Sequence, residues 1–276
     1  MACDRAAALG ALRPAVSRPD CFWRHGTSEA QQYDCIDGRS RVCPRCCVEH
    51  CAIDTPDHFA ACAEAGHPTW PAVAQGRAVP SKLVCLESYW DDQLFHTRSV
   101  KGFLEALGPT LHPPLRVAHR FVESGRGLAH YTKRPDGLLW TQPGVWNAPV
   151  YYLALHGGPG RVLSVLDAIG SDALCDAFRG YGSYDCLIYF GSCGVLRGRE
   201  GETFARDLLD ASGCRAVIGY TMDLDWMPSM LTDLLFLQRF YAHPDPWTGL
   251  TAIHASVQRD FAPARELGLT LVRAGA

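Results

Sequence analysis

The sequence predicts an α/β protein: a three-layer sandwich with a mainly parallel sheet of six strands, preceded by a small Cys/His-rich module. From Val79 onward, short apolar segments alternate with segments that carry apolar residues at helical spacing. The central apolar segments are hydrophobic on both faces, as expected of strands that lie between two layers of helices. Residues 1–78 lack such periodicity. We therefore expect a module at 1–78 and an α/β domain at 79–276.

The elements of the α/β domain are expected in a regular order along the chain. The six expected strands are 81–87, 115–122, 150–155, 186–190, 215–220 and 269–273. The expected helices are 100–107, 171–179, 203–211, 226–241 and 254–266, the first of them ended by Gly108-Pro109. The polar stretch 125–144 is rich in turn residues, and Trp140 within it is a candidate for an edge strand.

Composition and charge favour an ordinary globular protein. Of the 276 residues, 47% are hydrophobic and 20% are charged. The formal net charge of -3 gives no electrostatic basis for binding nucleic acid or an acidic membrane. No apolar run approaches the roughly 20 residues of a spanning helix, and the N-terminus lacks the pattern of a secretory leader. We expect a cytoplasmic protein.

The cysteines are concentrated near the N-terminus, where eight of the thirteen precede residue 63. Four residues there, Cys43, Cys46, His58 and Cys62, have the spacing C-x2-C-x11-H-x3-C of a small zinc finger. Four protein ligands leave no open position, so a zinc ion here would be structural. Rival ligands are Cys35, Cys47, His50, Cys51 and His67. The alternative is a cysteine-rich region without metal.

Two reactive side chains follow two of the expected strands. His156 follows 150–155, and Cys193 follows 186–190 within Gly191-Ser192-Cys193-Gly194. Parallel strands end at the same edge of a sheet, and such edges carry the sites of open α/β sheets. A thiol nucleophile needs a base beside it, so we expect His156 and Cys193 to meet as base and nucleophile. The alternative is a structural role for both residues, in which the cysteine is simply buried and the histidine caps a turn.

Two further residues, Gly157 and Asp223, are candidates for the same site. The backbone N–H groups of Gly157 and Cys193 are the expected oxyanion donors. Asp223 follows the strand 215–220 and is a candidate for binding a basic substrate side chain, although an exposed turn carboxylate is the commoner case.

The segments YYLALHGGPG and CLIYFGSCGVL resemble the two motif blocks of the caspase-like cysteine peptidases, the clan of caspases, metacaspases, gingipains and CHAT domains. With KLVCLESYW and GCRAVIGYTMDLDW, the chain is similar to a bacterial branch of that group over about residues 82–273. The resemblance implies a six-stranded sheet, a His156/Cys193 dyad, no catalytic cofactor and a protein or peptide substrate. It also suggests an activating partner or ligand, and a role in regulated bacterial cell death or defence. The chain departs from the family in its short His-to-Cys interval and in lacking an acidic residue directly before Cys193.

Two other functions stay open at this stage. His156-Gly157-Gly158-Pro159-Gly160 also resembles an oxyanion loop of α/β-hydrolases, but 191–195 lacks the final glycine of the G-x-S-x-G elbow. An enzyme of that kind would act on small esters or amides. The second is a caspase-like interaction module without turnover. The leading hypothesis is a cysteine endopeptidase.

Overall fold

The computed structural model describes residues 33–34, 41–42, 81–90, 98–134, 136–141, 148–181 and 185–274, with backbone alone at 33–34, 41–42, 140 and 141. The chain divides into two units, Met1–Ala78 and Val79–Ala276. In the first unit, the described strands β1 (Tyr33–Asp34) and β2 (Arg41–Val42) pair antiparallel. None of the described helices is long and apolar enough to span a membrane.

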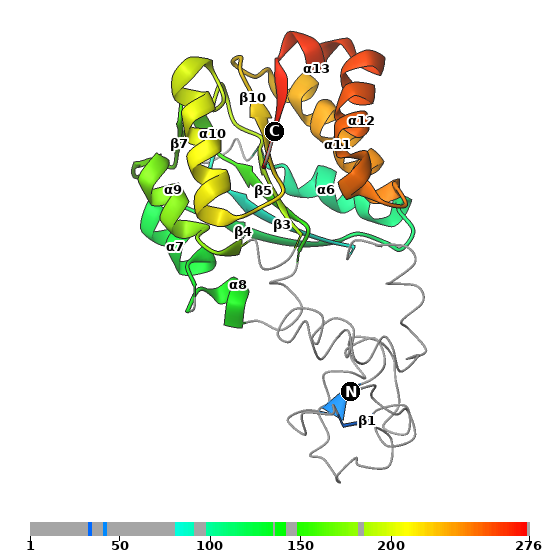
Figure 1. Ribbon diagram of the computed structural model, residues 1–276, viewed down its shortest axis with the longest axis horizontal. Helices are drawn as coiled ribbons and strands as arrows, with labels where there is room; N and C mark the ends of the chain where they lie inside the picture. Colours follow the sequence, from blue (N-terminus) through cyan, green and yellow to red (C-terminus); the bar gives the residue numbers. More distant parts are fainter. Residues whose placement is uncertain are drawn as a thin grey trace. The chain divides into compact units, whose positions relative to one another are not determined.

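The second unit is built on a six-stranded sheet with the order β11-β10-β9-β5-β3-β4 (Figure 1). Five of these strands run parallel, and β11 pairs antiparallel with β10 at one edge. The strands are β3 (Lys82–Glu87), β4 (Arg116–Phe121), β5 (Val150–Ala154), β9 (Leu187–Phe190), β10 (Ala216–Tyr220) and β11 (Leu269–Arg273). The prediction of an α/β protein with a mainly parallel sheet of six strands is confirmed.

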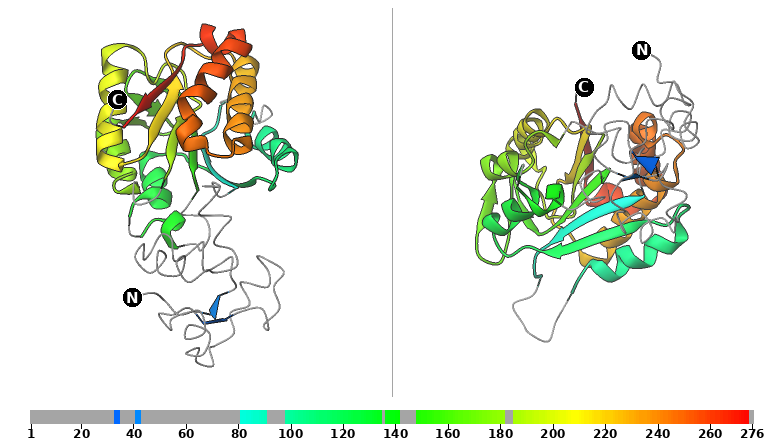
Figure 2. Two further views of the ribbon diagram at one scale, coloured as in Figure 1. Left: turned by 45° about the vertical axis from the view of Figure 1, so that its right-hand side comes forward. Right: turned by 90° about the horizontal axis from the view of Figure 1, so that it is seen from below.

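Helices cover both faces of this sheet (Figures 1 and 2). Alternate residues of the central strands enter two separate cores; on β5, Tyr151 and Leu153 belong to one and Tyr152 to the other. One core is shared with α7 (Gly125–Thr132), α9 (Ser171–Ala177) and α10 (Gly198–Ser212). The other is shared with α6 (Lys101–Leu107), α11 (Trp226–Ala242), α12 (Pro246–Asp260) and α13 (Ala262–Glu266). Burial on both faces explains why the strands are apolar throughout.

The structure differs from the sequence-based expectation in three segments. The stretch 125–144, expected to form turns with Trp140 on an edge strand, instead contains α7 and the short α8 (Leu138–Thr141), which includes Trp140. Ser124 caps α7 by accepting a hydrogen bond from Gly127 N, a local signal that the polar composition obscured. The helix expected at 203–211 begins earlier, at Gly198. The helix expected at 254–266 is two helices, because α12 begins at Pro246 and the chain breaks helical geometry at Phe261.

A small second sheet follows β5. Its strands β6 (His156–Gly158), β7 (Arg161–Leu163) and β8 (Ala168–Gly170) form an antiparallel meander. A short 3-10 turn, η2 (Gly108–Thr110), follows α6 on the other face. Because β5 and β9 are neighbours in the main sheet, the segments that leave their carboxyl ends begin side by side.

Candidate active site

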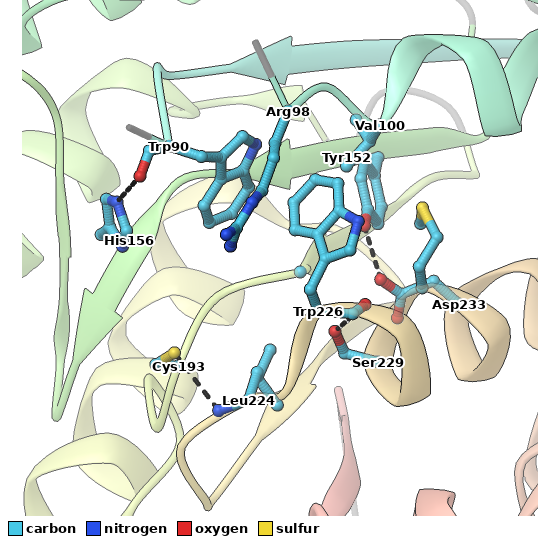
Figure 3. Close-up of a pocket in the computed structure, with 12 residues that line it drawn as sticks. Trp90, Arg98, Val100, Tyr152, His156, Cys193, Leu224, Trp226, Ser229 and Asp233 are labelled. Atoms are coloured by element: carbon cyan, nitrogen blue, oxygen red, sulfur yellow. Dashed lines mark hydrogen bonds between the residues drawn. The ribbon is translucent and has the colours of Figure 1, made fainter. Parts of the chain in front are cut away.

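A pocket of about 150 Å³ lies at the carboxyl ends of the sheet strands (Figure 3). Both predicted reactive residues, His156 and Cys193, line it. Its walls are mainly apolar and aromatic, which is typical of a small-molecule or side-chain site. The remaining lining residues are Trp90, Arg98, Val100, Tyr152, Gly191, Leu224, Trp226, Ser229, Met230 and Asp233.

Cys193 lies in the turn that follows β9, with its thiol partly exposed. Gly194 adopts φ 52°, in the left-handed region that favours glycine, and its N–H donates to Met222 O at 2.8 Å. The backbone N–H of Leu224 points at Cys193 Sγ, with an N···S distance of 3.3 Å (Figure 3). The segment after β10 thus holds the thiol from one side and leaves it open to the pocket on the other.

His156 begins β6, separated from the end of β5 by Leu155 alone, and is exposed. Its Nε2 lies 3.3 Å from the backbone oxygen of Trp90, and the imidazole packs edge-on against the Trp90 indole with 5.1 Å between ring centroids. The same indole contacts Trp226 at 5.3 Å, also edge-on. Trp90 therefore stands between the imidazole and the far wall of the pocket.

The two loops that carry His156 and Cys193 approach each other closely. A Cβ added at Gly157 would lie 2.5 Å from Cys193 O and 2.9 Å from Ser192 Cβ. Ser192 is fully buried, and its hydroxyl donates to Leu153 O at 3.3 Å. Only a residue without a side chain fits at 157, so this glycine is required by close approach rather than by backbone conformation.

The pocket contains a buried carboxylate that the sequence analysis did not single out. Asp233 on α11 accepts hydrogen bonds from the hydroxyls of Tyr152 and Tyr189, each at 2.5 Å, and of Tyr220. Burial raises the pKa of Asp233 to about 6, against the opposing effect of the three hydroxyls. The sequence did carry a signal: Asp233 is the one acidic residue in the mainly apolar helix 226–242.

Asp223, the predicted substrate-binding residue, lies outside the pocket lining. Its exposed carboxylate accepts from Arg197 Nη2 at 2.7 Å, and Arg197 Nε donates to Thr221 O at 2.8 Å. The pair braces the segment after β10 against the start of α10. Recognition of a basic substrate side chain by Asp223 stays a prediction.

The predicted zinc ligands Cys43, Cys46, His58 and Cys62 lie outside the described residues. Within the described part of the chain, no group of three or more His, Cys, Asp or Glu side chains is arranged to hold a metal ion. The alternative histidine for an α/β-hydrolase, His254, is in the middle of α12, where its Nε2 lies 3.0 Å from Leu269 O, and it does not line the pocket.

No known family model matches the sequence, and no curated protein matches it. Among solved structures, the chain is similar to caspase-1 from Spodoptera frugiperda, with 12% identity and a TM-score of 0.44. The match covers 70% of this chain and 86% of that one.

Proposed function

We propose that the chain is a cysteine-type peptidase in which Cys193 is the nucleophile and His156 the general base. The observation that supports this most is that both side chains, placed by neighbouring parallel strands, line one pocket. Covalent acyl transfer needs a nucleophile and a base that can reach each other, and two residues that line one pocket can meet over the same substrate. The motif resemblance to caspase-like peptidases is consistent with the same roles.

The chemistry proceeds through an acyl-enzyme. His156 takes the proton from the Cys193 thiol, and Sγ attacks the carbonyl carbon of the scissile bond to give a tetrahedral oxyanion. Collapse breaks the C–N bond, and the imidazolium returns the proton to the leaving amine. Water, deprotonated by His156, then hydrolyses the thioester and regenerates the thiol. Positioned acid–base catalysis of this kind contributes about 10²- to 10⁴-fold in rate.

The proposed oxyanion donors are the backbone N–H groups of Gly157 and Cys193. Support comes from the close approach of the two loops, in which there is no room for a Cβ at 157 beside Cys193 O. Loss of one such donor costs about 3 kcal/mol of transition-state stabilisation in known examples. The aromatic pocket beside them, walled by Trp90 and Trp226, would receive a substrate side chain.

The other parts of the proposal concern partners and the N-terminal module. The substrate is a protein or peptide, and an activating partner or ligand is expected from the resemblance. A structural zinc held by Cys43, Cys46, His58 and Cys62 would stabilise the module, since so small a segment gains folding free energy from its metal. Inductively coupled plasma mass spectrometry of the purified full chain tests that part directly.

The decisive experiment labels the full chain with a peptidyl electrophile that reacts with thiols and locates the adduct by mass spectrometry. We expect selective modification of Cys193. In His156→Ala, the rate of Cys193 modification should fall by about 10²-fold or more. Cys175 is the matched internal control, because burial raises the pKa of its thiol and should keep it slow. Equal labelling of Cys193 with and without His156 would contradict the proposal.

Substrate class separates the remaining alternatives. Turnover of peptides that is abolished in Cys193→Ala supports a peptidase. Turnover of small esters without peptides would indicate the α/β-type hydrolase. A selectively labelled Cys193 with no turnover of either would favour an interaction module or an enzyme that awaits its activator.

A further inference from the structure

Glu87, the last residue of β3, is a fully buried carboxylate with four hydrogen-bond partners. Its Oε1 accepts from Trp90 Nε1 at 2.7 Å and from Val100 N at 2.8 Å. Its Oε2 accepts from Ser99 Oγ at 2.6 Å and lies 2.6 Å from His119 Nε2. A carboxylate offers about four lone-pair sites, so these partners occupy it completely. Burial of the group is tolerable only because of them.

Three of the four partners belong to the segment that follows β3. Trp90 precedes residues 91–97, and Ser99 and Val100 come after them, immediately before α6. Trp90 and Val100 also line the pocket. One carboxylate therefore fixes two separate stretches of the pocket wall, on either side of a connecting segment.

Trp90, which donates a hydrogen bond to Glu87, also contacts His156. The indole that donates to Glu87 packs on the imidazole, and the backbone oxygen of the same residue lies 3.3 Å from His156 Nε2. His156 is exposed, so burial does not hold its ring in place. A shift of Trp90 would move both of these contacts together.

We propose that Glu87 is a positioning residue of the site: its carboxylate fixes the Trp90 indole, and Trp90 in turn orients the His156 imidazole. The step that concerns reactivity rests on the proposed His156/Cys193 dyad. The orientation of His156 does not depend on that dyad, and it can be measured without any reaction at Cys193.

Two readouts separate positioning from a general effect on folding. The first is the rate at which diethyl pyrocarbonate modifies His156, located by mass spectrometry in the native full chain. The second is the alkylation rate of Cys193 by iodoacetamide. In Glu87→Gln an NH₂ group replaces one acceptor oxygen, so we expect His156 modification to quicken severalfold. We expect Cys193 alkylation to slow about tenfold, within the range that misplacement of a catalytic group costs.

A double-mutant cycle tests the route through Trp90. Trp90→Phe keeps an aromatic ring but lacks the indole N–H, and it leaves Glu87 its other three partners. If Glu87 acts through Trp90, His156 modification in the double variant Glu87→Gln/Trp90→Phe should be no faster than in either single variant. If the two residues act independently, their effects on this rate should multiply. Multiplied effects would overturn the proposed route. If Glu87→Gln does not fold, Trp90→Phe alone must still quicken His156 modification severalfold.

Ser99→Ala is the matched control, since it also removes one donor to Glu87 but does not touch Trp90. We expect its rates of His156 modification and Cys193 alkylation to stay close to those of wild type, because the carboxylate keeps its hydrogen bonds to Trp90 and Val100. Equal changes in Ser99→Ala, or unchanged His156 modification in folded Glu87→Gln, would overturn the positioning role. If Cys193 alkylation proves independent of His156, the peptidase proposal fails while the diethyl pyrocarbonate result still decides the role of Glu87.

Discussion

Two buried carboxylates beside the pocket, Glu87 and Asp233, are held in different ways. The three hydroxyls that contact Asp233 come from Tyr152, Tyr189 and Tyr220, on three neighbouring strands of the central sheet. The partners of Glu87 come mainly from the irregular segment after β3. Both carboxylates are buried, but one is anchored in regular structure and the other organises a loop.

The difference indicates separate roles for the two carboxylates. The Asp233 cluster joins α11 to β5, β9 and β10, so it fixes the position of a helix against the sheet. Glu87 instead determines where individual side chains of the pocket wall lie. We expect changes at Asp233 to appear chiefly in stability and changes at Glu87 chiefly in the reactivity of the site.

The largest effect is expected for Asp233→Ala, which leaves three buried tyrosine hydroxyls without their acceptor. At about 1–3 kcal/mol for each unsatisfied group, the free energy of unfolding at pH 5 should fall by about 3 kcal/mol or more. Urea denaturation followed by circular dichroism measures it. Tyr189→Phe, which removes one donor and leaves the acceptor, should lose much less. Equal losses in the two variants would contradict the cluster's role as a clamp.

The pH dependence of stability is a second way to distinguish Asp233 from Glu87. Folding raises the pKa of Asp233 from 3.8 to about 6, so its stabilising contribution is complete below about pH 4 and is lost as the pH rises through 6. At about 1.36 kcal/mol per pKa unit, the loss over this window is about 3 kcal/mol. Urea melts at several pH values should show it. We expect Asp233→Asn to abolish this component of the slope, and Glu87→Gln to retain it.

Gly157→Ala tests the close approach of the loops that carry His156 and Cys193, which neither carboxylate contacts. Its new methyl group would meet Cys193 O at 2.5 Å, whereas at Gly158 the nearest atom, Arg161 Nε, is 3.6 Å away. Overpacking costs about 1–3 kcal/mol, so Gly157→Ala should lower the melting temperature and slow Cys193 alkylation. The matched Gly158→Ala should do neither. Similar behaviour of the two variants would show that the loops are not tightly packed.

The smallest effect is expected for Asp223→Asn. Its carboxylate is exposed and pairs with Arg197 outside the pocket, and exposed pairs contribute little. Cys193 alkylation should change less than about threefold, within the range of weak surface electrostatics. Peptide turnover gives a separate answer: a selective loss of cleavage after basic residues would support the sequence-based hypothesis that Asp223 binds them.

The sheet and the two loops that carry His156 and Cys193 could be predicted because their signals are local. Six apolar segments of strand length alternate with segments that carry apolar residues at helical spacing. This pattern is enough to predict a parallel sheet with helices on both faces. His156 and Cys193 were predicted for one edge because both follow strands, and the structure places both on one pocket. The helix α7 was missed because its capping signal at Ser124 lies in a polar stretch of turn-forming composition.

By itself, the sequence determined the class of fold, the order of the strands along the chain and the two candidate reactive residues. The order of strands in the sheet and the groups around Asp233 and Glu87 were decided by tertiary structure. Tyr152 is 81 residues from Asp233, and Glu87 is 32 residues from His119. Periodicity reports which face of an element is buried, but not which buried polar groups from distant strands will meet. Those partners are selected only when packing excludes water, because each buried donor and acceptor must then be satisfied within the protein.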